Sequence, residues 1–332
     1  MAEIAYIGGY TPGGTPGTEG TGPGITLMEP AGLTRVAETP APSPSFLTAH
    51  PRLPVLYAVG EGEPGTVAVF ARAADGTLTE TDRRPSEGNT PCHLAVDPSG
   101  TLLSVANYGD GVVSVYPIDE TGALAAPQVF PHREDSHAHQ SVFGPDGVLY
   151  VSDLGTDEIR RYLVPGPGRA GARVTPHPGG PVRLAEGMGP RHMARVGERW
   201  YVAGELDGTV RAYDAGDDGW REVRAVPAGA AGAADGENHP SHLEASGDGR
   251  FVYVANRGPD TIAVFSVPGL ERVAEVPCGG AWPRHFAVAG DRMYVANQRS
   301  AGVAVLPMRD GVPGDAAGVF AVGTPSCVLP LS

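Results

Sequence analysis

Four residues of this chain combine types that suit anion binding with types that suit proton transfer: a histidine, two arginines and a glutamate. They lie in four short segments, with His139 in SHAHQ, Arg191 in GPRH, Glu205 in AGEL and Arg257 in ANRG. Arginine forks bind carboxylate or phosphate through two parallel hydrogen bonds. An imidazole and a carboxylate beside them can accept and donate protons during a reaction. If the four segments meet in space, they predict a site for a small anionic substrate.

An internal repeat positions these segments. Units that begin with Pro-x-His or a related tripeptide start at positions 44, 91, 138, 190, 240, 283 and 325. Each unit reads as a strand, a turn such as DPSG or SGDGR, a second strand such as FVYVAN, a Gly-rich turn and a third strand. A fourth, less regular strand leads to the next unit. Four short strands repeating every 42 to 52 residues are typical of β-propeller blades.

The seventh unit starts at Pro325 and contains only one strand, but the first residues of the chain contain the missing three. EIAYIGGYT reads as a second strand, GITLMEP as a third and LTRVAETP as a fourth. Pairing the two ends of the chain in one blade leaves no free sheet edge. The sequence therefore predicts an all-β, seven-bladed β-propeller whose last blade is closed by N- and C-terminal strands. It predicts one domain over residues 1–332.

The composition excludes several classes of function. The 48 glycines and 33 prolines leave little room for long helices. A net charge of −14 argues against nucleic acid or an anionic membrane as a partner. All 24 basic residues are arginine, which excludes Schiff-base lysine chemistry and the phosphate-loop lysine. Since the N-terminus lacks the pattern of a signal peptide and no apolar run could span a membrane, a cytoplasmic location is expected.

Comparing the repeats with one another separates packing positions from candidate functional positions. Two residues after each start, the blades carry Phe46, His93, Gln140, His192, His242, His285 and Cys327. A residue that recurs around the ring is expected to be a hydrogen-bonded packing device between blades. One residue earlier they carry Ser45, Cys92, His139, Arg191, Ser241, Arg284 and Ser326. Because side chains alternate along a strand, this second set is predicted to face the other way, into the channel mouth.

A further ring lies where each second strand ends. It consists of Tyr10, Glu61, Tyr108, Leu154, Glu205, Arg257 and Gln298. His139, Arg191, Glu205 and Arg257 come from consecutive blades and are expected to converge, with Arg284 as a third guanidinium nearby. Glu61 and His137 are additional candidates for substrate binding, although GEGEPG around Glu61 reads as an exposed turn. His137 and His139 could begin a metal site, but no further ligand has suitable spacing, so neither metal nor organic cofactor is expected.

The blade motifs resemble those of a known family. YIGGYT, SPSFLTAHP, NTPCHLAVDPSG, SHAHQSVFGPDG, GPRHMA, NHPSHLEASGDGRFVYVANRG, WPRHFAV and TPSCVLP span the whole chain at blade spacing. They are similar to the lactonase family of seven-bladed propellers, which includes bacterial 6-phosphogluconolactonases and fungal carboxy-muconate cyclases. The resemblance implies that His139, Arg191, Glu205 and Arg257 form the active site.

The expected activity is hydrolysis of an anionic sugar lactone such as 6-phosphogluconolactone, in a monomer or weak homodimer. Glu205 would be the base that activates water, Arg191 or Arg257 the oxyanion donor, and His139 the acid. Nearby arginines are expected to lower the pKa of Glu205, which would weaken it as a base. Two alternatives stay open. One is a muconate-type cycloisomerase or a related ring-forming or ring-opening enzyme, and the other is a non-catalytic propeller that binds a ligand or protein.

Overall fold

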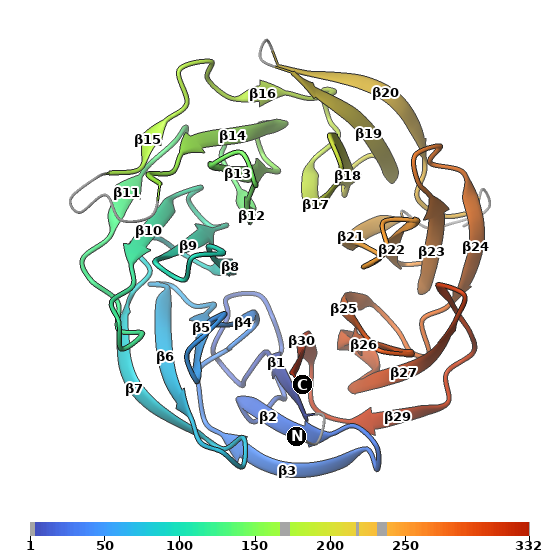
Figure 1. Cartoon of the computed structure of the whole chain (residues 1–332). Coiled ribbons are helices and arrows are strands. Elements are labelled where there is room, and N and C mark those ends of the chain that lie inside the picture. The colour runs from blue at the N-terminus through green and yellow to red at the C-terminus, as the bar shows by residue number, and fades with distance from the viewer. Residues whose placement is uncertain (1–3, 167–172, 217–218, 231–237, 332) are drawn as a thin grey trace.

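Seven antiparallel sheets surround a central axis like the blades of a propeller (Figure 1). The computed structural model describes residues 4–166, 173–216, 219–230 and 238–331. Blades I to VI follow one another along the chain, and blade VII combines its two ends. The predicted all-β, seven-bladed architecture is confirmed. Six of the seven predicted unit starts fall within one residue of an observed first strand, while in blade I the strand begins at Leu47.

The inner half of each blade consists of two regular strands. In blade order from I to VII, the innermost strands are β4 (Leu47–Ala49), β8 (Pro91–Val96), β12 (Ala138–Phe143), β17 (Pro190–Val196), β21 (His239–Ala245), β25 (Pro283–Ala289) and β30 (Pro325–Leu331). In the same order, the second strands are β5 (Val55–Gly60), β9 (Leu102–Asn107), β13 (Val148–Asp153), β18 (Arg199–Gly204), β22 (Phe251–Arg257), β26 (Arg292–Asn297) and β1 (Ile4–Gly9).

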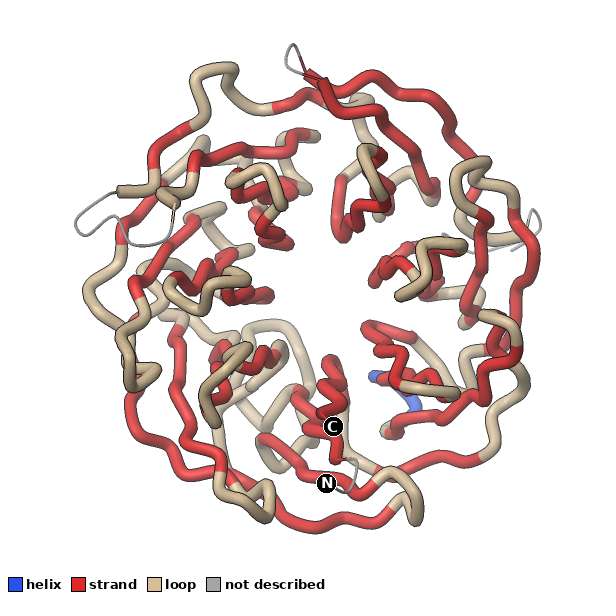
Figure 2. The backbone as a smooth tube through the Cα atoms, in the orientation of Figure 1, coloured by secondary structure: helices blue, strands red, loops and turns tan. Residues whose placement is uncertain are grey.

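The outer half of each blade is less regular. The third strands are β6 (Thr66–Arg72), β10 (Val113–Pro117), β14 (Glu158–Leu163), β19 (Thr209–Gly216), β23 (Thr261–Ser266), β27 (Gly302–Arg309) and β2 (Ile25–Glu29). The outermost strands are β7 (Leu78–Pro85), β11 (Gln128–Phe130), β15 (Thr175–Pro176) with β16 (Val182–Arg183), β20 (Gly219–Pro227), β24 (Arg272–Pro277), β28 (Val312–Pro313) with β29 (Gly318–Ala321), and β3 (Thr34–Thr39). Within the described residues, the one helix is the 3₁₀ turn η1 (Gln298–Ser300), drawn in blue in Figure 2.

Blade VII closes the ring as predicted. Its sheet has the order β3-β2-β1-β30, so the C-terminal strand is innermost and the N-terminal segment supplies the other three strands. β1 and β30 pair from Ile4 opposite Leu331 to Gly9 opposite Pro325. Ladder hydrogen bonds between the two ends of the chain therefore hold the last blade together.

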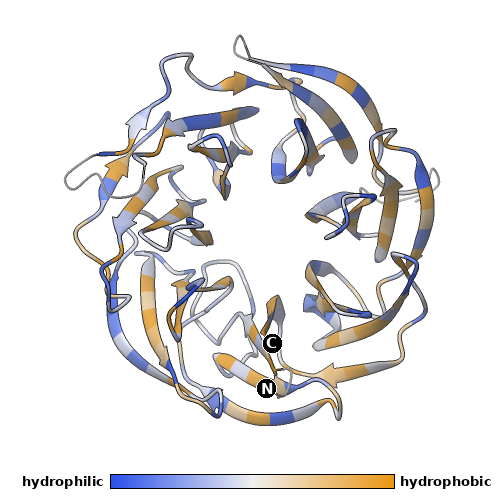
Figure 3. Cartoon of the chain, viewed as in Figure 1, coloured by the Kyte–Doolittle hydropathy of each residue, from blue (hydrophilic) through white to orange (hydrophobic). Residues whose placement is uncertain are grey.

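Apolar side chains fill the spaces between neighbouring blades. Among the described residues, seven buried clusters occur, one at each of the seven blade-to-blade contacts. The third strands β6, β23 and β27 are largely hydrophobic, whereas the outer strands β7 and β20 carry many hydrophilic residues (Figure 3). This pattern arises because the middle strands are covered by blades on both faces and the outermost strands meet water.

Tyrosines of the second strands tie neighbouring blades together. The hydroxyl of Tyr57 in blade I donates to the carbonyl of Gly122 in blade II at 2.8 Å, and that of Tyr253 in blade V donates to Gly311 in blade VI at 2.8 Å. Both glycines have positive φ, at 88° and 82°, in the turn that leads out of the third strand. Glycine is suited to that turn because it adopts positive φ without a steric penalty.

Candidate active site

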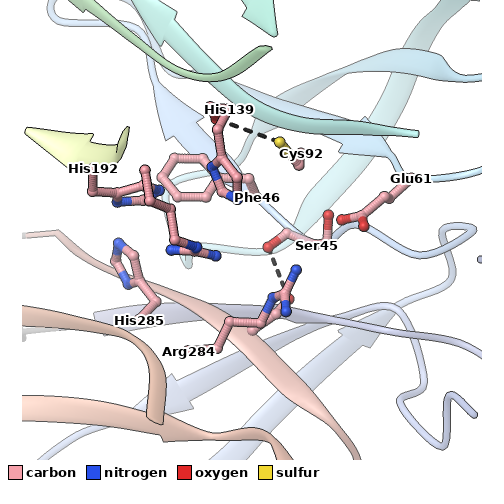
Figure 4. A pocket seen from close by; sticks show the side chains of 10 residues that line it. Ser45, Phe46, Glu61, Cys92, His139, His192, Arg284 and His285 are labelled. Carbon is pink, nitrogen blue, oxygen red and sulfur yellow. Dashed lines mark hydrogen bonds between the residues drawn. The ribbon is translucent and has the colours of Figure 1, made fainter. Parts of the chain in front are cut away.

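One cavity of about 380 Å³ lies where the innermost strands begin and the second strands end. We call it the channel cavity. It is lined by Thr15, Pro16, Thr18, Glu61, Thr90, Cys92, Tyr108, Gly109, His139, Arg191, Glu205, Arg257 and Arg284. A smaller adjoining cavity shares several of these residues and is also lined by Phe46, His192 and His285 (Figure 4). Six of the seven predicted site residues therefore line one space together, and His137 does not.

Glu205 lies between two guanidinium groups. Its Oε2 is 2.7 Å from Nε of Arg191, and its Oε1 is 2.8 Å from Nη2 of Arg257. Both arginines are buried. Burial alone would raise the pKa of Glu205, but Arg257 and Arg191 outweigh it and lower the pKa below its ordinary value. The carboxylate is therefore ionised and fixes the orientation of the two forks.

Arg191 keeps a donor free for a ligand. Its Nη1 is buried and has no hydrogen-bond partner among the described residues, while Nε faces Glu205. A buried guanidinium nitrogen without an acceptor is unfavourable, because it has lost its hydrogen bonds to water and has formed none with the protein. The arrangement becomes favourable when a substrate oxygen enters the cavity and accepts that hydrogen bond.

Glu61 and Arg284 add a second carboxyl group and a third guanidinium group to this cavity. Glu61 is only 7% exposed, so the expectation of an exposed turn is wrong for this residue, whereas Glu63 and Pro64 at the tip of the turn are exposed. The hydroxyl of Tyr10 lies 3.3 Å from both carboxyl oxygens, and the hydroxyl of Thr15 donates to the Glu61 carbonyl. Tyr10 and Thr15 belong to blade VII and the loop after β1, which covers the GEGEPG turn. Burial raises the pKa of Glu61, and Arg284 partly offsets that effect.

His139 is a buried imidazole of the channel cavity. It is 5% exposed, and its Nδ1 has no hydrogen-bond partner among the described residues. Burial, followed by the charge of Arg191, lowers the pKa of His139 well below its ordinary value. The imidazole is therefore unprotonated at neutral pH and can accept a proton.

His137 does not line the channel cavity. Its ring stacks on Tyr108 with centroids 4.6 Å apart, and its Nδ1 lies 2.8 Å from the Tyr108 carbonyl. It can thus hold Tyr108, which does line the cavity, but it does not meet His139 in a metal-binding arrangement. Across the described residues, no group of three or more His, Cys, Asp or Glu side chains has a geometry that could hold a metal ion.

The recurrent second position of the repeat packs blades together, as predicted. Nδ1 of His93 accepts a hydrogen bond from the Ser141 amide of the next blade at 3.4 Å, and Nδ1 of His285 does so from Val328 at 3.3 Å. Oε1 of Gln140 accepts from the Met193 amide at 2.7 Å. Each of these side chains therefore satisfies a backbone donor of the following blade.

The prediction that neighbouring positions on the first strand face opposite ways is confirmed in part. Cys92, His139, Arg191 and Arg284 line the channel cavity as expected, without the residue that follows each. Strict alternation is not kept at the smaller adjoining cavity, which Arg191 and His192 line together, as do Arg284 and His285. The reason is a β-bulge: the pairing of first and second strands shifts register between Pro190 and Met193 and between Pro283 and His285. A bulge suspends strict alternation, so two consecutive side chains point to one side.

Some cavity residues carry no signal in the repeat. Thr15, Pro16 and Thr18 come from the loop between β1 and β2, which has no counterpart in the other units. Thr90 and Gly109 lie at turn positions that look like ordinary turn residues in sequence. Tyr108 belongs to the predicted ring at the end of the second strands, but its type alone assigned it no role.

Comparisons with known proteins agree with this architecture. The family model described as "Lactonase, 7-bladed beta-propeller" matches residues 4–330. The chain is 32% identical to a 6-phosphogluconolactonase of Bacillus subtilis over 92% of this chain and 91% of that protein. A 6-phosphogluconolactonase of Formosa agariphila is 29% identical over 79% of this chain and 80% of its own length. The structure of the periplasmic gluconolactonase PpgL of Pseudomonas aeruginosa superposes with a TM-score of 0.87 at 28% identity, covering 99% of both chains. No helix within the described residues is long and apolar enough to cross a membrane.

Proposed function

The chain belongs to the lactonase family of seven-bladed β-propellers, and we propose that it is a lactonase that hydrolyses an anionic sugar lactone such as 6-phosphogluconolactone. The observation that carries this proposal is the convergence of three arginines, two glutamates and a neutral histidine on one cavity. The names of its relatives, two 6-phosphogluconolactonases and a gluconolactonase, support the reaction class. A cytoplasmic location, a monomeric or weakly dimeric state and the absence of macromolecular partners stay predictions.

The guanidinium groups supply the electrostatic part of the reaction. Attack of water on the lactone carbonyl places negative charge on the carbonyl oxygen, and a prepositioned donor stabilises that charge. Arg191 is suited to this task because its Nη1 is buried and unpartnered among the described residues. Arg257 is held beside it by Glu205, and Arg284 faces the same cavity. Together the three charges attract an anionic substrate into a protein that is acidic overall.

The contacts favour a different division of the proton-transfer roles from the one expected from sequence. Both carboxyl oxygens of Glu205 are engaged by guanidinium groups, so neither is free to take a proton from water. His139 is neutral and has a free Nδ1 among the described residues. We assign the proton-accepting role to His139 and a positioning role to Glu205. His139 would take a proton from the attacking water and return it to the ring oxygen as the carbon–oxygen bond breaks.

Replacing His139 by Asn tests this assignment. Asparagine keeps a polar side chain of similar reach but cannot take up a proton, so kcat for 6-phosphogluconolactone should fall by about 10²–10⁴-fold. KM should change little because the three arginines are intact. The measurement is proton release at constant pH, corrected for spontaneous lactone hydrolysis.

Two results would overturn the proposal at different levels. Full turnover by His139→Asn would exclude His139 as the proton acceptor while leaving the lactonase activity in place. Absence of turnover by the parent protein on 6-phosphogluconolactone and on glucono-δ-lactone would exclude the reaction itself. Turnover of a muconate by the parent would then support the ring-forming alternative.

A further inference from the structure

The charges of the channel cavity nearly balance without any ligand. Three guanidinium groups face two carboxyl groups, which leaves an excess of one positive charge when both carboxyl groups are ionised. A phosphate monoester carries between one and two negative charges near neutral pH. A further cation at the rim of this cavity would therefore strengthen the binding of a phosphorylated lactone.

Blade VI breaks the repeat at the positions where such a cation would lie. The turn after the second strand is glycine-rich in most blades, with Gly62, Gly109, Gly155 and Gly258 at the same place. In blade VI this turn is the 3₁₀ turn η1, and Arg299 occupies the glycine position. The residue before the first-strand proline is likewise enlarged there, to Trp282.

Backbone hydrogen bonds show that these positions are equivalent between blades. In blade II, the amide of Tyr108 donates to the Thr90 carbonyl at 3.1 Å and that of Gly109 donates to Asn89 at 2.9 Å. In blade VI, the amide of Gln298 donates to the Trp282 carbonyl at 3.1 Å and that of Arg299 donates to Ala281 at 3.1 Å. Thr90 and Gly109 line the channel cavity. The equivalent His137 of blade III does not line the cavity, so the placement of Trp282 at its rim rests on the contact of the Trp282 ring with the cavity residue Arg257.

The Trp282 indole links Arg299 to the cavity. The guanidinium carbon of Arg299 lies 3.4 Å from the centre of the Trp282 ring, and that of the cavity residue Arg257 lies 5.4 Å from it. Stacking on the ring holds the Arg299 guanidinium while leaving its edge donors available. The Arg299 side chain makes no hydrogen bond or ion pair with any described residue.

The position of Trp282 is fixed by its backbone. Its φ is +64°, and the equivalent residues Ser43, Thr90, Gly189 and Thr324 of other blades also have positive φ, so this conformation belongs to the repeat. The Trp282 amide donates to Oδ1 of Asp260 at 2.7 Å, and the neighbouring Ala281 amide donates to Oγ of Ser300 at 2.9 Å. In blade VI the contacts fix the ring against which Arg299 stacks.

We propose that Arg299, held by Trp282, binds the phosphate group of a phosphorylated sugar lactone at the rim of the channel cavity. This inference rests on the proposed lactonase function and specifies its substrate class. The lactone ring would occupy the cavity beside Arg191 and His139, with the phosphate directed toward blade VI. Arg299 would then be a specificity-determining residue that takes no part in ring opening.

The test compares two substrates that differ only in the phosphate. Arg299→Ala should lower kcat/KM for 6-phosphogluconolactone by about 10–100-fold, the scale expected for a lost hydrogen bond to a charged group. Its kcat/KM for glucono-δ-lactone should change by less than about twofold. Arg299→Lys should recover part of the loss, since the charge returns without the planar fork. The matched control is Arg292→Ala, which removes the same charge from the opposite end of β26.

Three outcomes separate the possibilities. A loss confined to the phosphorylated substrate, accompanied by weaker binding of 6-phosphogluconate in calorimetry, supports the phosphate subsite. Equal losses on both substrates, or unchanged values on both, overturn it without affecting the lactonase assignment. Absence of hydrolysis of either lactone by the parent protein overturns the proposed function, and with it this inference.

Discussion

At the scale of single residues, Glu205 and His139 are distinguished by their partners. Glu205 contacts two buried guanidinium groups, whereas Nδ1 of His139 contacts no hydrogen-bonding group of the described residues. Sequence alone could place both among the candidates, in two neighbouring rings, because the repeat revealed their register. It could not assign their roles, because the roles depend on how Arg191 and Arg257 orient their forks.

Glu205→Gln distinguishes a positioning role from a catalytic one. The amide cannot balance two buried positive charges, so the free energy of unfolding should fall by up to about 3–5 kcal/mol. Added phosphate should recover part of this loss by binding between the freed forks. The activity that remains should keep the acid limb of the kcat–pH profile, because His139 still titrates. Disappearance of that limb in Glu205→Gln would return the base role to Glu205.

At the scale of elements, the repeat predicted strands and blade order well but misjudged two local features. The bulge at the Pro-x-His segment leaves no mark in the hydrophobic pattern, so consecutive residues were expected on opposite faces. The burial of Glu61 depends on Tyr10 and Thr15, which lie about fifty residues earlier in the chain. The residues around Glu61 in GEGEPG do not indicate that a loop of another blade contacts it, so its burial could not be predicted from the local sequence.

The tyrosine hydrogen bonds between neighbouring blades are predicted to stabilise the fold without affecting catalysis. Tyr57→Phe removes the hydroxyl that donates to the Gly122 carbonyl and leaves a buried acceptor without that partner. The free energy of unfolding should fall by about 1–3 kcal/mol, while kcat should stay unchanged because Tyr57 does not line the channel cavity. Urea denaturation and steady-state kinetics measure the two effects. Tyr108→Phe, a change inside the cavity, is the contrasting variant, and a loss of activity in Tyr57→Phe would argue against a purely structural tie.

At the scale of the whole molecule, the propeller brings five histidines from different blades into its central channel. His93, His139, His192, His242 and His285 are buried, and several of their rings contact one another. Nδ1 of His192 lies 2.7 Å from Nδ1 of His242, so one of the two nitrogens donates and the other accepts. Two charged imidazoles could not share that contact because neither would have an acceptor nitrogen, so at least one of the two rings is neutral in the packed channel.

This cluster predicts that the fold loses stability in mild acid. Burial lowers the pKa of all five histidines, that of His242 to about 3. The unfolded chain takes up protons at these residues near pH 6.5 and the folded chain does not, so the free energy of unfolding falls as pH drops below 6.5. Each such histidine contributes about 1.4 kcal/mol per pH unit to this fall in the free energy of unfolding.

Glu61 and Glu244 oppose the trend because burial raises their pKa, that of Glu244 to about 8. With Glu244 offsetting one histidine, the net slope between pH 6 and 5 should be at most about 6 kcal/mol per unit, and the raised pKa of Glu61 reduces it further. Urea denaturation at pH 7.5, 6 and 5 measures it, and His242→Gln should reduce the slope by the share of one histidine. A stability that stays constant from pH 7.5 to 5 would mean that the folded channel accepts these protons.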